Sequence, residues 1–156
     1  MIIRGFLDKS FSPPAPAVRA FISIEHLGIE GNVKLLIDTG ASSTAMLDKD
    51  RELLGIDLEK IERAPMKIGG IGGLVDTYLA RNAKLSFRAQ DGEYVEAIDI
   101  PVLKRDISGI PEDVARRILA MPSLLGRDVM RKFKLTYSEM EGCVTLEGLL
   151  NFNGRI

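Results

Sequence analysis

The residues of this chain best suited to do chemistry lie in the run IDTGAS at residues 37–42, which follows two leucines. A carboxylate at the end of a buried strand can take a proton from water if its neighbours are fixed and a substrate can come close. The Thr39 hydroxyl can fix such a loop by hydrogen bonding, and Gly40 allows a sharp turn beside a bound peptide. The run therefore indicates Asp38 as a general base, although Asp-Thr-Gly alone is also typical of an aspartate that caps a short helix.

A second segment, MKIGGIGG at residues 66–73, holds four glycines within residues 69–73. So many glycines cost conformational entropy on folding, which favours a mobile hairpin tip over a packing role. A dinucleotide-binding fingerprint starting at Gly70 would need Gly or Ala where Val75 stands, and the chain has no Gly-Lys-Ser/Thr sequence of a P-loop. A plain flexible turn stays open as the alternative.

A third segment, SLLGRD at residues 123–128, places an apolar pair before a Gly-Arg sequence. In this order the three segments resemble the retroviral aspartic proteases, or retropepsins, over about residues 17–138. The resemblance implies a mainly β, single-lobe, closed β-barrel fold with one or two short helices, and a glycine-rich flap over the substrate. The site residues that it implies are catalytic Asp38, Thr39 and Gly40; substrate-binding Ala41, Ser42, Ile68, Gly69, Gly70, Ile71, Gly72 and Gly73; and structural Leu124, Leu125, Gly126 and Arg127.

The resemblance also implies that the chain works as a homodimer. The family's mechanism uses two carboxylates that share one proton around a water molecule, whereas this chain has a single Asp-Thr-Gly sequence. A two-fold axis through the site would place Asp38 of a second copy opposite the first. The expected partners are therefore a second copy of the chain and a peptide or protein substrate, and the expected activity is that of an aspartic endopeptidase.

Three features depart from the retroviral pattern. Retroviral members often carry an acidic residue two positions after the motif glycine, where this chain has Ser42, so Arg127 lacks its usual nearby partner. A helix predicted near Pro111 to Ala120 has no counterpart in the compact retroviral enzymes. The strand at residues 143–149 extends the usual C-terminal end, and we expect it to contribute to the dimer sheet.

The periodicity predicts mostly strands, in one domain at residues 17–156 after an extended segment at residues 1–16 that contains three prolines. We expect strands at 17–26, 33–37, 74–87 and 93–103, turns at 28–32 and 91–92, and a hairpin of 134–137 and 143–149. Short helices are expected at 47–54, 111–120 and 127–133. Charged helix residues expected in solvent are Asp48, Asp50, Glu52, Glu112 and Asp113, and apolar residues expected in the core are Met46, Leu53, Leu54, Ile118 and Leu119.

The composition limits the possible functions. A chain of 156 residues with 46% hydrophobic residues can bury one substantial core, and its net charge of -1 gives no electrostatic argument for nucleic-acid or anionic-membrane binding. No apolar run approaches the roughly 20 residues that span a bilayer. His26 and Cys143 are single copies, so the spacing predicts no zinc site, disulfide or Cys-His nucleophile. We expect a cytoplasmic protein without metal or cofactor.

Two other classes of function were weighed against a protease. A peptide-binding or dimerisation module could keep the fold without proteolysis, but such a module has no need of the acid at Asp38. A phosphotransfer enzyme of the sugar-kinase type can also carry a loop of aspartate, glycine and threonine. Its usual two-domain size is well beyond this chain.

Overall fold

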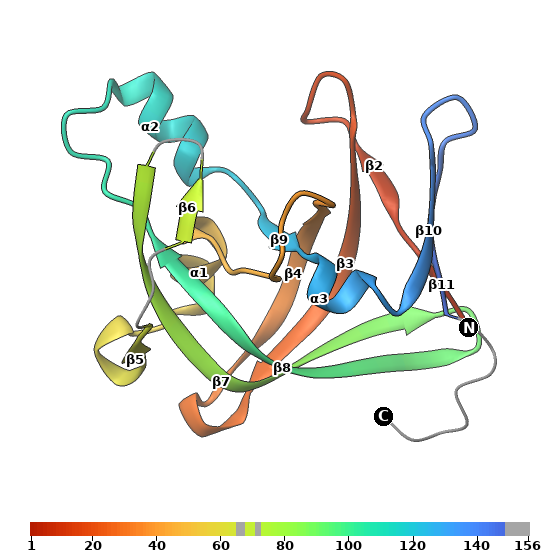
Figure 1. Ribbon diagram of the computed structural model, residues 1–156, viewed down its shortest axis with the longest axis horizontal. Helices are drawn as coiled ribbons and strands as arrows, with labels where there is room; N and C mark the ends of the chain where they lie inside the picture. Colours follow the sequence, from red (N-terminus) through yellow and green to blue (C-terminus); the bar gives the residue numbers. More distant parts are fainter. Residues whose placement is uncertain (65–67, 71–72, 149–156) are drawn as a thin grey trace.

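The computed structural model describes residues 1–64, 68–70 and 73–148, and it shows the mainly β fold that the sequence predicts (Figure 1). The strands are β1 (Ile2–Arg4), β2 (Phe6–Asp8), β3 (Ala15–Ile24), β4 (Ile29–Ile37), β5 (Glu62–Arg63), β6 (Ile68–Gly70), β7 (Gly73–Ala89), β8 (Gly92–Lys104), β9 (Ser123–Leu125), β10 (Phe133–Ser138) and β11 (Cys143–Gly148). The α-helices are α1 (Asp48–Leu54), α2 (Glu112–Leu119) and α3 (Arg127–Met130). Short 3-10 helices lie at Glu25–Leu27 and Leu58–Lys60.

The strands form one curled sheet with the order β10-β11-β1-β7-β3-β4-β9. Its longest element is the β7–β8 hairpin, which bends across the whole molecule in Figure 1, from the neighbourhood of α2 to the end occupied by β10 and β11. The register of this hairpin shifts between Ala80 and Ala83, where Asn82 adopts a left-handed backbone with φ of 54°. Its turn joins Ala89 to Gly92, as the Asp-Gly pair predicts.

The first eight residues contribute two strands to the sheet, in contrast to the expectation of a segment that precedes the core. Strand β1 pairs with both β11 and β7, and its Ile3 is only 1% exposed. Strand β2 pairs with the start of β3, where Pro16 lies opposite Leu7. Strands of three residues are too short to show a recognisable alternation in sequence. The extended segment was therefore predicted from its prolines alone.

Most of the other predicted elements are confirmed within one or two residues, including helices α1 and α2 and the C-terminal hairpin, whereas the third helix ends at Met130, three residues before its predicted end. The predicted turn at 28–32 is wrong, because the chain reverses earlier, through the 3-10 helix at 25–27. Gly28 ends that helix with φ of 64°, in the left-handed region that glycine enters at little cost. Strand β4 then starts at Ile29, which lengthens the β3–β4 pairing toward the predicted catalytic loop.

One large core fills the curled sheet, and a smaller cluster of Ala45, Leu47 and Leu103 lies beside it. Met46 is buried as predicted, but Leu53 is 71% exposed, so its place in the core is a wrong prediction. Asp48 and Asp50 were expected in solvent and are instead 2% and 3% exposed. The predicted orientation of α1 is therefore wrong. Its two aspartate side chains face the interior, where they are hydrogen-bonded to distant segments.

The two buried carboxylates of α1 tie this helix to the segments on either side of α2. Oδ2 of Asp50 accepts hydrogen bonds from the backbone N of Ser123, at 3.0 Å, and from its Oγ, at 2.6 Å. Oδ1 of Asp48 accepts from the backbone N of Arg105 at 3.1 Å. These bonds satisfy polar groups that would otherwise be costly to bury, and they fix the start of β9.

Candidate active site

The parallel pair of strands β4 and β9 positions the predicted catalytic residue. Leu36 lies opposite Leu124 and Ile37 opposite Leu125, and these paired ends of the two strands are apolar because core packs against them. The backbone N of Asp38 donates to the carbonyl of Leu125 at 3.1 Å. Asp38 therefore leaves the sheet at the carboxyl end of two buried strands, as the run IDTGAS predicts.

The loop after β4 closes tightly around the Asp38 carboxylate. Oδ1 accepts from the backbone N of Gly40 at 2.9 Å, and the carbonyl of Asp38 accepts from the backbone N of Ala41 at 3.1 Å. A Cβ at Gly40 would lie 3.1 Å from Oδ1, so a larger residue would crowd the carboxylate. No described residue donates a hydrogen bond to Oδ2. The carboxylate is thus held by one oxygen and presents the other.

The surface around this carboxylate is open in the single chain. The Asp38 side chain is half-buried, whereas Thr39, Gly40 and Ser42 are exposed. An aspartate with one free oxygen at a solvent-facing loop can bind a water molecule and accept its proton. One chain accordingly supplies one carboxylate that can act as a base, together with the loop that holds it in place.

The predicted structural segment at 124–127 lies directly against this loop. The backbone N of Arg127 donates to the carbonyl of Ala41 at 2.9 Å, and the Nη1 of Arg127 donates to the carbonyl of Thr39 at 2.7 Å. A Cβ at Gly126 would lie only 2.2 Å from the carbonyl carbon of Ser43, so this position requires glycine. The Arg127 side chain therefore binds the loop through the backbone carbonyl of Thr39. This carbonyl takes the place of the acidic partner that is missing at Ser42.

Two further residues, Thr44 and Asp128, join the loop to α3, and the sequence analysis missed both. Oδ1 of Asp128 accepts from the Oγ1 of Thr44 at 2.7 Å and from its backbone N at 2.9 Å. The Oγ1 of Thr44 in turn accepts from the backbone N of Gly126 at 3.0 Å. We call Thr44 and Asp128 the loop clamp. Both stand in polar stretches, SST at 42–44 and RD at 127–128, so the sequence carries no signal that singles them out.

The glycine-rich segment forms a hairpin in its described part. Strand β6 pairs with β7 so that Ile68 lies opposite Val75, Gly69 opposite Leu74 and Gly70 opposite Gly73. The predicted site residues Ile71 and Gly72 lie outside the described residues. No hydrogen bond or ion pair joins the described part of this hairpin to the loop at 38–44. The structure thus brings 38–42 and 124–127 together, with the hairpin a separate element near α2 in Figure 1.

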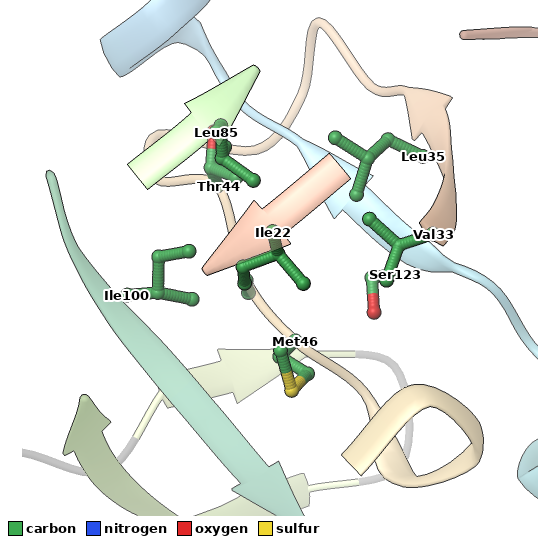
Figure 2. Close-up of a pocket in the computed structure, with 9 residues that line it drawn as sticks. Ile22, Val33, Leu35, Thr44, Met46, Leu85, Ile100 and Ser123 are labelled. Carbon is green, nitrogen blue, oxygen red and sulfur yellow. The ribbon is translucent and has the colours of Figure 1, made fainter. Parts of the chain in front are cut away.

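A small cavity lies in the core beneath the loop and is too small for a substrate. Its volume is about 10 Å³, close to the least space that holds one water molecule. Figure 2 shows its mostly aliphatic lining, with Thr44 and Ser123 as the polar members. Both hydroxyls already take part in the bonds described above, so this cavity is no second site.

The described residues contain no recognisable metal site. No group of three or more of their His, Cys, Asp and Glu side chains is placed to hold a metal ion. Among the helices of the described ranges, none has the length and apolar character needed to cross a membrane.

Comparison with known proteins places the chain in a family. Residues 24–129, more than half of the chain, match the family model described as aspartyl protease. No curated protein matches. A retropepsin-like aspartic protease from Rickettsia conorii matches with a TM-score of 0.52 and 20% identity, over 94% of this chain and 88% of that one. The EIAV protease complexed with the inhibitor HBY-793 matches with a TM-score of 0.48 and 17% identity, over 75% of this chain and 86% of that one.

The family match includes the two segments that meet in the structure, the loop at 38–44 and the segment at 124–127. At 20% identity, the likeness to the Rickettsia enzyme shows a common fold. The chain therefore belongs to the aspartyl protease family, and its fold is retropepsin-like.

Proposed function

We propose that this chain is an aspartic endopeptidase whose active site is completed by a second copy of the chain. The observation that carries the proposal is the geometry of Asp38: its Oδ1 accepts a hydrogen bond from Gly40, while its Oδ2 is bonded to none of the described residues and lies at an exposed loop. Family membership supports proteolysis as the activity. The dimer and the steps below are our proposal.

The second carboxylate must come from outside the single chain. The acidic residue bonded to the loop is Asp128, but its two oxygens accept hydrogen bonds from Thr44, and Oδ1 accepts from Val129 as well. A carboxylate with its acceptor sites occupied in this way is a structural anchor and a poor acid or base. A two-fold copy would instead bring a second Asp38 to the first, and the exposed Thr39 would lie where the two loops meet.

The paired carboxylates would divide the chemistry between a base and an acid. Two close carboxylates cannot both ionise cheaply, so one Asp38 holds a proton and the other does not. The charged Asp38 takes a proton from water, and the water oxygen bonds to the carbonyl carbon of the peptide. The protonated Asp38 donates a hydrogen bond to the carbonyl oxygen; the C–N bond then breaks, and the amine leaves with a proton.

Substrate would bind as an extended strand between the loop and the glycine-rich hairpin. Ala41 and Ser42 follow the catalytic aspartate. The backbone groups of Ala41 are bonded to Asp38 and Arg127, so Ala41 would contact a peptide through its side chain, whereas the exposed Ser42 could also contact it through its backbone N. The β6–β7 hairpin would close over the peptide as a flap and add strand-like hydrogen bonds. The closed hairpin would also exclude water from the reacting atoms.

The proposal is tested by incubating the protein with a mixed peptide library across pH, beside the variant Asp38→Asn. The amide is nearly isosteric but cannot accept the proton, so cleavage should fall by about 10²- to 10⁴-fold while the fold survives. Asp57→Asn is the matched control, because Asp57 is an exposed aspartate that caps a short helix through the backbone N of Glu59. Unchanged turnover in Asp38→Asn would overturn the catalytic assignment.

A further inference from the structure

The main sheet splits on one edge of β7, and the split opens a groove on the surface. Along this edge, Phe21, Ile22 and Ser23 of β3 pair with residues 84–86, whereas Ala89 pairs with Ile3 of β1. The preceding residues of β3, Arg19 and Ala20, pair on their other side with β4 and have no partner on β7. The strands therefore diverge beyond Ser86, between its last pair with β3 and the pair that β1 forms.

The groove at this split has a volume of about 370 Å³. It is formed by the diverging strands β3 and β7 together with one residue of β4 and the start of β8. Its lining consists of Arg19, Ala20, Phe21, Asn32, Ser86, Arg88, Gly92 and Glu93. It is distinct from the loop at 38–44, which contributes no lining residue.

Two arginines supply the positive charge of the groove. The guanidinium of Arg19 is stacked over the ring of Phe6, with its carbon 4.8 Å from the ring centroid, which fixes its position and leaves its N–H groups unbonded to described residues. Arg88 is exposed and makes no hydrogen bond or ion pair with any described residue. Glu93 lies opposite Arg88 in the β7–β8 register, yet the two side chains form no ion pair. Both arginines are free to bind an anion.

An apolar strip continues from the groove across the sheet. Phe21 lies opposite Ser86, and Ser86 lies opposite Val95, so the three side chains share one face in one row. Phe21 is 38% exposed and Val95 is 47% exposed, which is high for such side chains. The groove thus combines two unpaired guanidinium groups with neighbouring exposed apolar side chains. A simple anion would use the cations and leave the apolar strip uncovered.

We propose that this groove binds an acidic, partly apolar segment of a polypeptide partner. Carboxylates of the segment would bind Arg19 and Arg88 by charge-assisted hydrogen bonds, and its apolar side chains would cover Phe21 and Val95. Glu93 opposes this binding by like-charge repulsion and selects against a more acidic segment lying along β8. The groove goes beyond the proposed proteolysis, since its residues take no part in the reaction.

The test measures binding in the full chain carrying Asp38→Asn, so that cleavage does not interfere. The probes are two fluorescein-labelled peptides of about twelve residues, one of alternating Glu and Leu and one with Gln in place of Glu, followed by fluorescence anisotropy. We expect the Glu peptide to bind about tenfold more tightly, and added salt to reduce the difference. Arg19→Gln with Arg88→Gln should abolish the difference between the peptides.

Two control variants keep the result specific to the groove. Lys49→Gln with Lys60→Gln removes the same charge at two exposed positions outside the groove and should leave the difference unchanged. Glu93→Gln should tighten binding of the Glu peptide, a gain that a folding defect does not produce.

Three results would overturn the proposal: equal binding of the two peptides, a difference that survives the double arginine variant, or groove-dependent binding of a single-stranded oligonucleotide in place of the peptide. Cleavage of a short neutral peptide by the double arginine variant, in a chain with Asp38 intact, tests proteolysis separately. That activity should equal the unmodified protein's, so failure of one proposal is distinguishable from failure of the other.

Discussion

The position of Asp38 depends on hydrogen bonds from its own loop and from distant segments. Its backbone is held by Leu125, its Oδ1 by Gly40, and the loop that follows by the clamp of Thr44 and Asp128. Thr44 is 1% exposed, so its polar groups have no access to water if Asp128 is removed. The position of the Asp38 carboxylate therefore depends on a partly buried polar contact between residues 84 positions apart.

We predict that Asp128→Ala lowers the free energy of unfolding by about 1–3 kcal/mol, because a buried N–H and hydroxyl lose their acceptor. Peptide cleavage should also fall, with a larger effect on kcat than on KM, since the loop positions Asp38 in the reaction. Urea unfolding and steady-state kinetics measure the two effects. Asp106→Ala is the control, because the exposed Asp106 accepts from the backbone N of Ser108 two residues away. Equal effects of the two variants would contradict a special role for the clamp.

Asp8 gives the fold a dependence on pH. Its carboxylate is buried on β2, and Oδ2 lies 2.5 Å from the Nζ of Lys34 on β4. Burial raises the pKa of Asp8, but hydrogen bonds from Lys34 and Ser10 outweigh burial and lower this pKa to about 2. The charged form is therefore favoured in the folded state.

We predict that Asp8→Asn lowers the free energy of unfolding by about 2 kcal/mol at pH 7 and by much less near pH 2. The pKa in the folded state lies below the unfolded value of about 4, so the stabilisation is complete above pH 4 and is lost as the pH falls toward 2. Urea unfolding of both proteins at the two pH values measures this. A difference that does not change with pH would show that the ion pair contributes nothing through the charge of Asp8.

At this scale the sequence predicted the residues with local constraints and missed those bonded at a distance. Asp38, Gly40 and Gly126 are recognisable because the chemistry or the backbone demands those types in a short run. Asp50 was assigned to solvent because a carboxylate on a short helix usually lies there. Its partner Ser123 is 73 residues away, and only the folded chain brings the two together.

The strands and hairpins were likewise predicted where the signal lies within a short stretch of sequence, and missed where pairing joins distant segments. Hairpins such as β7–β8 and β10–β11 were predicted because alternation and turn residues are local signals. Strands β1 and β2 were missed because three residues carry no usable period, and their pairing with β11 and β3 joins distant parts of the chain. The parallel pairing of β4 with β9 was not predicted, because it joins segments about 90 residues apart and leaves no local signal in the sequence.

We predict that the amide hydrogens of Gly69 and Gly70 exchange more slowly once a peptide analogue with a hydroxyl at the tetrahedral centre is bound. The described pairing of β6 with β7 extends only from Ile68 to Gly70, and a closing hairpin would gain hydrogen bonds to the ligand. Hydrogen exchange with and without the analogue measures this. The amides of β10 serve as the internal reference. Equal exchange at Gly69 and Gly70 in both states, with the ligand shown to be bound, would indicate a rigid turn and no flap.

The whole molecule holds half of the proposed site, and its sheet closes the N-terminal strand against the C-terminal hairpin. Strand β11 was expected to contribute to a dimer sheet, but its two edges are already paired with β10 and β1. In the described residues, the free edge at this end belongs to β10. The first strand and the C-terminal hairpin thus pair with each other within one chain, and, among the described strands, a second copy could reach this end of the sheet only through β10.

The central claim is that one catalytic site needs Asp38 from two chains, and mixing active with inactive chains tests it most directly. Asp38→Asn protein is added to a fixed amount of unmodified protein, far above the concentration at which dimers dissociate, and peptide cleavage is measured after the chains have exchanged. A shared site predicts that an equal amount of the variant lowers activity to about half, because mixed dimers carry one carboxylate and are inactive. Activity that stays constant at every ratio, with exchange confirmed by mass spectrometry, would contradict the account and place a complete site in each chain.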